Sequence, residues 1–243
     1  MADVRVRKAV RDAIDFNGLI SALKGADVQA NGVVPKGLLG FNQNIVQQQN
    51  LDEAKSLLAA AGYGPGGNKL SLTMTYAEGD ADQQLFATLL TSALQQLGVE
   101  LKATPLQWNA QWDRAKSADK AKRQDIFVMY WYPDYADAYS WFINVFHSAE
   151  PPFFNLAYWN NPVADKLIDS LPAVTAVTPP LAQAAYTTLQ KMIIDQDAVG
   201  RAVQIVELPP AQRPEKGGEA ERAQDQGDGN EHEQGGHRPE PGR

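Results

Sequence analysis

IFVMYWYPDYAD, residues 126–137, is the stretch that decides the fold of this chain. Its first part, 126–130, is apolar and rich in β-branched and aromatic residues, as is typical of a buried strand. The residues after it, 138–145, predict a helix. An acidic, aromatic segment between a strand and a helix lies at the strand's carboxyl end, where open α/β sheets usually bind ligands. We therefore expect the functional site here, with Asp134 as its central residue.

Strands and helices alternate in the sequence before this stretch. Residues 70–76 alternate apolar and polar side chains and predict a strand, and 99–103 predict a second one. Amphipathic patterns at 81–97 and 108–117 predict the helices that follow these strands. The order strand, helix, strand, helix, strand implies crossover connections and hence an α/β fold.

Three further helices are predicted ahead of the first strand, at 3–14, 15–23 and 51–61, the first two each beginning at an aspartate N-cap. The glycines after the third helix formally match the nucleotide-binding pattern G-x-G-x-x-G (Gly62, Gly64, Gly67). That fingerprint follows a strand and opens a helix, so that the helix N-terminus meets a pyrophosphate. Here the order is reversed, and the glycines predict a helix-to-strand turn instead.

The second half of the chain is predicted to be helical, with one interruption. Asn161 and Pro162 have the order of an N-cap and a first-turn proline. Further prolines predict a loop at 171–180, and apolar spacing predicts a final helix at 181–194.

The composition changes near residue 208. From 209 onward the chain has no aromatic and no β-branched residue. Such a segment cannot bury enough apolar surface to offset its ordering entropy. We therefore expect a folded part at 1–207 and a disordered tail at 208–243. The tail contains His232 and His237, but a disordered segment does not hold the geometry that metal chelation needs.

The bulk composition excludes several classes of function. The 243 residues have a formal net charge of -7, which argues against general nucleic-acid binding, and there is no cysteine for disulfides, thiolate catalysis or zinc ligation. No apolar run approaches the ~20 residues that a membrane span needs. The first residues lack the basic segment and apolar stretch of a signal peptide. We expect no cofactor and no metal.

No catalytic constellation stands out among the polar residues. Asp134 and Asp137 are a possible carboxylate pair for a glycoside-type hydrolase, but Asp137 also fits an N-cap of the following helix. A triad of Ser148, His147 and Asp134 would require neighbours in sequence to converge, and His147 is better interpreted as a packing residue. The many aromatic residues around the stretch suggest either a core or the wall of a pocket.

Four segments in order resemble the C-terminal lobe of the family 5 solute-binding proteins, which serve bacterial ABC importers of peptides and related solutes. They are DVRVRKAV with AID at 3–15, LDEAK with LL and AGY at 51–63, WYPDYAD at 131–137, and NNP at 160–162 with Asp165, Leu167 and Ile168. The resemblance covers roughly residues 3–197.

This resemblance implies a lobe of the type II periplasmic-binding-protein class, with a mixed sheet flanked by helices and no catalysis. A peptide or other small solute would be the ligand, and ABC permease subunits would be the partners. The aspartate of the family's W-x-x-D motif, which holds the ligand's ammonium in peptide-binding members, corresponds to Asp134. Trp131 and Tyr135 would form apolar walls beside it. The location implied is periplasmic or at the cell surface.

The resemblance begins at the family's second half and ends near residue 197. We therefore expect a truncated fragment that binds weakly, since it offers half of the clamp. A hydrolase using Asp134 and Asp137, or a non-functional fragment, is the alternative.

Overall fold

The computed structural model describes residues 2–24, 28–131 and 134–196, together with the backbone of 202–204. They belong to one compact unit, Met1–Leu208. The tail that we expect to be disordered, 208–243, lies outside the described residues, as do His232 and His237. None of the described helices has the length and apolarity that a membrane span requires.

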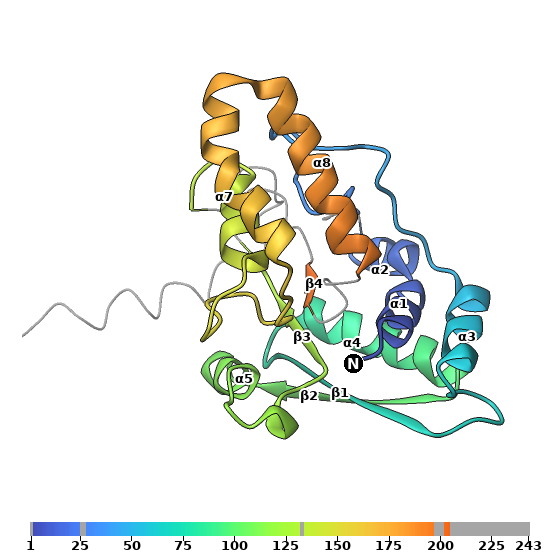
Figure 1. Ribbon diagram of the computed structural model, residues 1–243. Helices are drawn as coiled ribbons and strands as arrows, with labels where there is room; N and C mark the ends of the chain where they lie inside the picture. Colours follow the sequence, from blue (N-terminus) through green and yellow to red (C-terminus); the bar gives the residue numbers. More distant parts are fainter. Residues whose placement is uncertain (1, 25–27, 132–133, 197–201, 205–243) are drawn as a thin grey trace, which may run out of the picture. The chain divides into compact units, whose positions relative to one another are not determined.

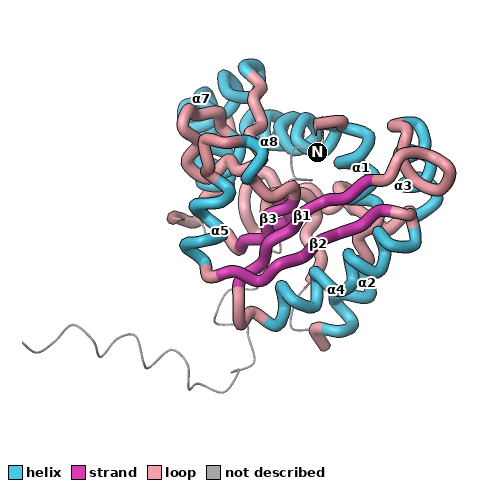
Figure 2. The backbone as a smooth tube through the Cα atoms, turned by 90° about the horizontal axis from the view of Figure 1, so that it is seen from below, coloured by secondary structure: helices cyan, strands magenta, loops and turns pink. Residues whose placement is uncertain are grey.

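Parallel strands form the sheet, in the order β2-β1-β3-β4. Figure 2 shows the first three of them side by side. Leu70 of β1 pairs with Val99 of β2, and Met74 of β1 pairs with Ile126 of β3. The strands are β1 (Leu70–Ala77), β2 (Val99–Leu106), β3 (Ile126–Met129) and β4 (Ala202–Gln204).

The alternation of strands and helices confirms the predicted α/β fold, but the direction of the strands differs from the prediction. We expected a mixed sheet, but every described pair is parallel. The connections explain this, because parallel neighbours need a crossover of a dozen or more residues. α4 (Ala81–Gln96) provides the crossover from β1 to β2, and α5 (Trp108–Ala115) lies in the connection from β2 to β3. Both helices were predicted from the sequence.

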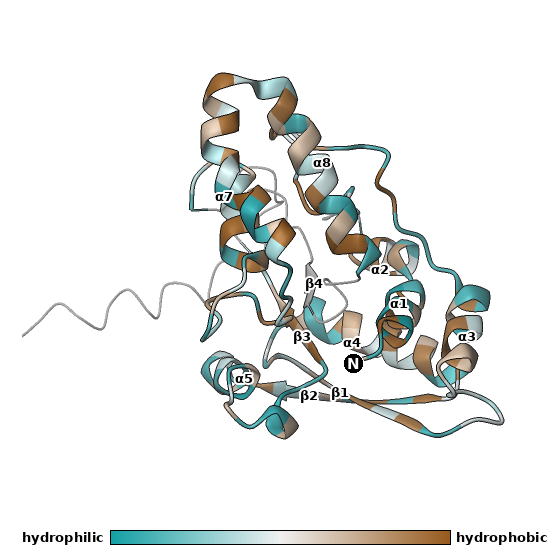
Figure 3. Cartoon of the chain, viewed as in Figure 1, coloured by the Kyte–Doolittle hydropathy of each residue, from teal (hydrophilic) through white to brown (hydrophobic). Residues whose placement is uncertain are grey.

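β3 divides the apolar interior into two cores. Its residues Ile126 and Val128 belong to the N-terminal core, with side chains from α1 (Val4–Asp12), α3 (Leu51–Ala60) and α4. Its residues Phe127 and Met129 belong to the aromatic core on the other side. The division follows because successive side chains of a strand point to opposite faces. All four residues are buried, and β3 is hydrophobic along its length (Figure 3).

The first two helices are capped as their aspartates predict. Asp3 accepts a hydrogen bond from the backbone nitrogen of Arg5 at 2.8 Å, and Asp15 accepts one from Gly18 at 2.8 Å at the start of α2 (Phe16–Ala22). The glycine-rich segment after α3 is a helix-to-strand turn. A Cβ on Gly67 would lie 2.8 Å from the carbonyl oxygen of Gly62, so this turn requires glycine for its close approach.

α7 (Pro162–Val177) and α8 (Pro179–Asp195) form a helical hairpin that turns at Thr178 (Figure 1). The loop that we predicted at 171–180 was wrong, because α7 continues through Pro172. Proline cannot donate the helical hydrogen bond to the carbonyl of Ile168. Ile168 and Leu171 are, however, fully buried, and their packing outweighs the lost bond.

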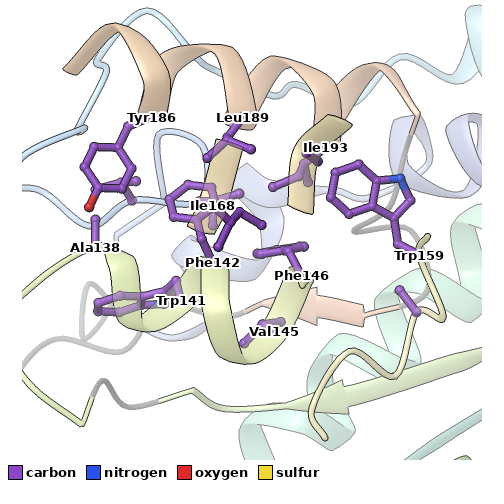
Figure 4. Packing of buried hydrophobic residues seen from close by; sticks show 14 of the residues in the cluster. Ala138, Trp141, Phe142, Val145, Phe146, Trp159, Ile168, Tyr186, Leu189 and Ile193 are labelled. Carbon is purple, nitrogen blue, oxygen red and sulfur yellow. The ribbon is translucent and has the colours of Figure 1, made fainter. Parts of the chain in front are cut away.

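The aromatic core joins this hairpin to the segment after β3. The predicted helix at 138–145 is present as α6 (Tyr139–Trp141) followed by a π-helix, η2 (Phe142–Phe146). Figure 4 shows Phe142 and Phe146 of η2 facing Leu189 and Ile193 of α8. The rings of Phe142 and Tyr186 lie 5.4 Å apart. This packing fixes the position of α6 and η2, which directly follow the segment around Asp134.

Candidate functional site

The segment after β3 lies at the carboxyl edge of the sheet. Because the strands are parallel, the ends of β1 and β2 reach the same edge. The backbone nitrogen of Glu78, after β1, donates to the carbonyl of Leu106, the last residue of β2, at 2.9 Å. Tyr130, after β3, donates through its hydroxyl to Oδ1 of Asp80 at 3.1 Å. Burial raises the pKa of Tyr130, and the charge of Asp80 raises it further.

Asp134 is exposed, and its carboxylate is held on one side only. Its Oδ2 accepts hydrogen bonds from Nδ2 of Asn144 at 3.1 Å and from Oγ of Ser140 at 3.4 Å. Its backbone nitrogen donates to Oγ of Ser140 at 3.2 Å. Its other oxygen, Oδ1, has no hydrogen-bond partner among the described residues. The carboxylate of this exposed residue is therefore held in place through Oδ2, while Oδ1 is left without a partner among the described residues.

Asp137 has a structural role. Its Oδ1 accepts from the backbone nitrogen of Tyr139 at 2.8 Å, as expected of a residue that caps the following helix, although the N-cap position itself is Ala138. The same oxygen accepts from the hydroxyl of Tyr186 at 3.0 Å. Burial raises the pKa of Tyr186, and the charge of Asp137 contributes to the shift. Because this carboxylate is engaged by the fold, a hydrolase that uses Asp134 with Asp137 is not supported.

Trp131 is half-buried and begins a row of aromatic rings. Its ring lies 4.7 Å from that of Phe154, edge to face, and Phe154 lies 5.3 Å from Trp112. Trp112 lies 5.8 Å from Trp108, which is 46% exposed at the start of α5. The row therefore extends from the end of β3 to the end of β2. Sequence reasoning missed Trp108 and Trp112, although both follow the end of a predicted strand, as Trp131 does.

Tyr135 lies next to Asp134 in sequence and is 48% exposed. Its pKa is raised by partial burial and by the nearby side chains of Tyr139, Asp137 and Asp134. The structure thus places all three predicted site residues on one segment. Trp131 packs against the protein, whereas Asp134 and Tyr135 are open to solvent.

His147 does not form the triad considered from the sequence. Its Nδ1 lies 2.9 Å from the carbonyl oxygen of Ser148, and its Nε2 lies 3.2 Å from Oδ1 of Asp169. Oγ of Ser148 is bonded to the carbonyl of Trp159, and the carboxylate of Asp134 is held by Asn144 and Ser140. In the part of the chain that the structure describes, no group of three or more acidic, histidine or cysteine side chains could hold a metal ion.

Comparison with curated proteins finds relatives that are named for peptide binding. The chain is 29% identical over 197 residues to the "Probable D,D-dipeptide-binding periplasmic protein DdpA" of Escherichia coli (strain K12), covering 79% of this chain and 36% of that protein. It is 27% identical over 202 residues to the "Periplasmic murein peptide-binding protein MppA" of the same organism, covering 80% and 36%. The chain thus spans little more than a third of the length of these relatives.

Solved structures share the fold. The Escherichia coli murein tripeptide binding protein MppA matches with a TM-score of 0.68 and 25% identity, over 81% of this chain and 38% of that one. A structure titled "Crystal structure of peptide ABC transporter, peptide-binding protein" matches with a TM-score of 0.64 and 20% identity, and 88% of its chain is covered. The latter shows the same fold in a solved chain of similar extent.

The family model described as "Bacterial extracellular solute-binding proteins, family 5 Middle" matches residues 1–152, more than half of the chain. This match includes β1, β2 and β3 and the segment around Asp134, whereas β4 and Phe154 lie beyond it. The chain therefore belongs to the family 5 bacterial extracellular solute-binding proteins, a family of binding proteins without catalytic activity.

Proposed function

We propose that this chain forms one wall of a peptide-binding site in the solute-binding component of an ABC importer. Asp134 is the contact for the ligand's ammonium group, and Trp131 and Tyr135 line the site beside it. The observation that carries the proposal is the geometry of the Asp134 carboxylate, which is fixed through Oδ2 and open at Oδ1. Relatives whose names state peptide binding support the ligand class.

The physical chemistry of the site favours a cationic nitrogen. A carboxylate is an acceptor without protons to donate, and a hydrogen bond between charged partners contributes ~1.5–3 kcal/mol. Asp134 has no cationic partner among the described residues, so its charge remains available to a ligand. The fixed position of its Oδ2 means that little freedom is lost on binding.

The aromatic row supplies the apolar part of the wall. Ligand sites combine apolar and aromatic lining with a few placed polar groups. The row from Trp131 to Trp108 has this composition and ends in an exposed ring. It would contact peptide side chains, while Asp134 fixes the amino terminus.

ABC permease subunits would be the partners of the whole protein, and the periplasm or the cell surface would be its location. The names of two relatives include the word periplasmic. Those relatives are nearly three times as long as the part that matches. We therefore expect this wall alone to bind peptides weakly, with dissociation constants near ~1 mM, or about 4 kcal/mol.

An NMR titration tests the role of Asp134. Ala-Ala-Ala and its N-acetylated form differ in the ammonium group, and we expect only the free amine to shift the signals of residues 134–144 saturably. Asp134→Ala should weaken binding of the free amine by at least ~10-fold, equivalent to about 1.4 kcal/mol. Asp113→Ala, which removes an exposed carboxylate from α5, is the matched control and should change nothing.

Two outcomes would contradict the proposal. Equal affinity for the free and the acetylated peptide would show that the ammonium is not recognised. An unchanged affinity in Asp134→Ala would remove Asp134 from the site.

A further inference from the structure

We infer that Asn144 makes Asp134 a one-oxygen acceptor, so that the site selects ammonium groups over guanidinium groups. This inference rests on the proposed function and names the class of cation that the site takes. Asn144 would be a specificity-determining residue that acts through Asp134 without touching the ligand.

The amide of Asn144 is held in one orientation. Its Nδ2 donates to Oδ2 of Asp134 at 3.1 Å and to the backbone carbonyl of Ser140 at 2.9 Å. Both partners are acceptors, so the amide nitrogen and not its oxygen faces them. Oγ of Ser140 lies 3.4 Å from the same carboxylate oxygen. Oδ2 is therefore surrounded by two protein donors.

The π-helix fixes the position of Asn144. The backbone nitrogen of His147 donates to the carbonyl of Phe142 at 3.0 Å, five residues earlier, which is the π-helical pattern. Such turns are rare in proteins as a whole, and those that occur are often found at functional sites. Phe142, Val145 and Phe146 around Asn144 are buried in the aromatic core. This packing prevents the turn from relaxing, so Asn144 stays against Asp134.

One free oxygen suits an ammonium better than a guanidinium. An ammonium is a compact point charge that a single oxygen satisfies, and its other protons can bond elsewhere. A guanidinium is planar and gains most from two parallel bonds to both oxygens of a carboxylate. With Oδ2 occupied, the guanidinium loses one of these bonds. We therefore expect a preference for the amine of at least ~10-fold.

The test compares two ligands in two variants. The ligands are Ala-Ala-Ala and the same peptide with its amino terminus converted to a guanidinium. Asn144→Leu keeps the approximate size of the side chain and removes the nearer of the two donors to Oδ2. Only the long contact of Ser140 Oγ, at 3.4 Å, then remains, and Oδ2 becomes accessible to a ligand. The ratio of the affinities for the amine and the guanidinium peptide should fall from at least ~10-fold to within ~2-fold. A tenfold ratio corresponds to about 1.4 kcal/mol. Gln95→Leu, an exposed amide on α4, is the control and should keep the original preference.

A ratio of affinities is not changed by a general loss of folded protein, so it separates selectivity from stability. A second readout needs no ligand: Asp134→Ala should shift the side-chain amide signals of Asn144 and speed their exchange with water. If Asp134→Ala weakens amine binding but Asn144→Leu leaves the preference unchanged, this inference is overturned and the proposed function stands. If Asp134→Ala has no effect on amine binding, or the unaltered chain binds neither ligand, both are overturned.

Discussion

At the scale of single residues, Gln190 joins two distant parts of the chain. Its Oε1 accepts from the backbone nitrogens of Val33 at 3.0 Å and Val34 at 3.2 Å, and its Nε2 donates to the carbonyl of Gly40 at 2.9 Å. The side chain is fully buried in α8. One amide therefore satisfies three backbone groups of a long segment that has no regular structure of its own.

Gln190→Leu should lower the free energy of unfolding by at least ~3 kcal/mol, because it leaves three buried backbone groups without a partner and each costs ~1–3 kcal/mol. Thr188→Ala on the same helix is the control. Among the residues that the structure describes, its exposed hydroxyl donates only to the carbonyl of Ala184. That control should stay within ~0.5 kcal/mol. Chemical denaturation measures both, and a loss in Gln190→Leu no larger than in the control would contradict the role of this amide.

The candidate site was predictable in part at this scale. The strand pattern before Trp131 placed Asp134 at a carboxyl edge, and the spacing to Ala138 indicated the structural use of Asp137. The partners Ser140 and Asn144 were not predictable, because the sequence pattern of a helix does not reveal a π-turn. Which oxygen of Asp134 is free depends on that turn.

At the scale of elements, local patterns predicted most boundaries to within a few residues. Capping aspartates, period-two alternation in β1 and glycine stops are local signals that the structure follows. The prediction failed at 171–180, where proline is a local signal for a break. The burial of Ile168 and Leu171 is a tertiary effect, and it overrides that signal.

Pro172→Ala should raise the free energy of unfolding by ~1–3 kcal/mol, because a helix-interior proline costs about 3 kcal/mol and part of that cost has been absorbed by the surrounding structure. The alanine can donate the missing bond to Ile168. Pro179→Ala is the matched control, because Pro179 is the first residue of α8, where proline fits. Thermal denaturation of both variants decides the matter. Equal effects would mean that α7 is not strained at Pro172.

At the scale of the whole described unit, the strand β3 lies between the two cores and contributes side chains to both. Alternate residues of β3 belong to the N-terminal core and to the aromatic core. If β3 unfolds, side chains of both cores therefore become exposed to solvent. The tryptophans give a probe for one side only. Trp141 and Trp159 are buried in the aromatic core, Trp112 and Trp131 pack against it, and Trp108 contacts Phe127.

Leu90→Ala tests whether the two cores unfold together. Leu90 is almost fully buried in α4 and belongs to the N-terminal core, which includes no tryptophan among its described members. The substitution should cost ~2–5 kcal/mol through lost burial and a cavity. If the unit is cooperative, tryptophan fluorescence should report the same lowered denaturation midpoint as far-UV circular dichroism, although every tryptophan lies on the other side of β3. Thr88→Ala, an exposed change on the same helix, should leave both midpoints in place. If the fluorescence midpoint is unchanged while the dichroism midpoint falls, the two cores unfold separately. The sheet would then couple the two cores only weakly.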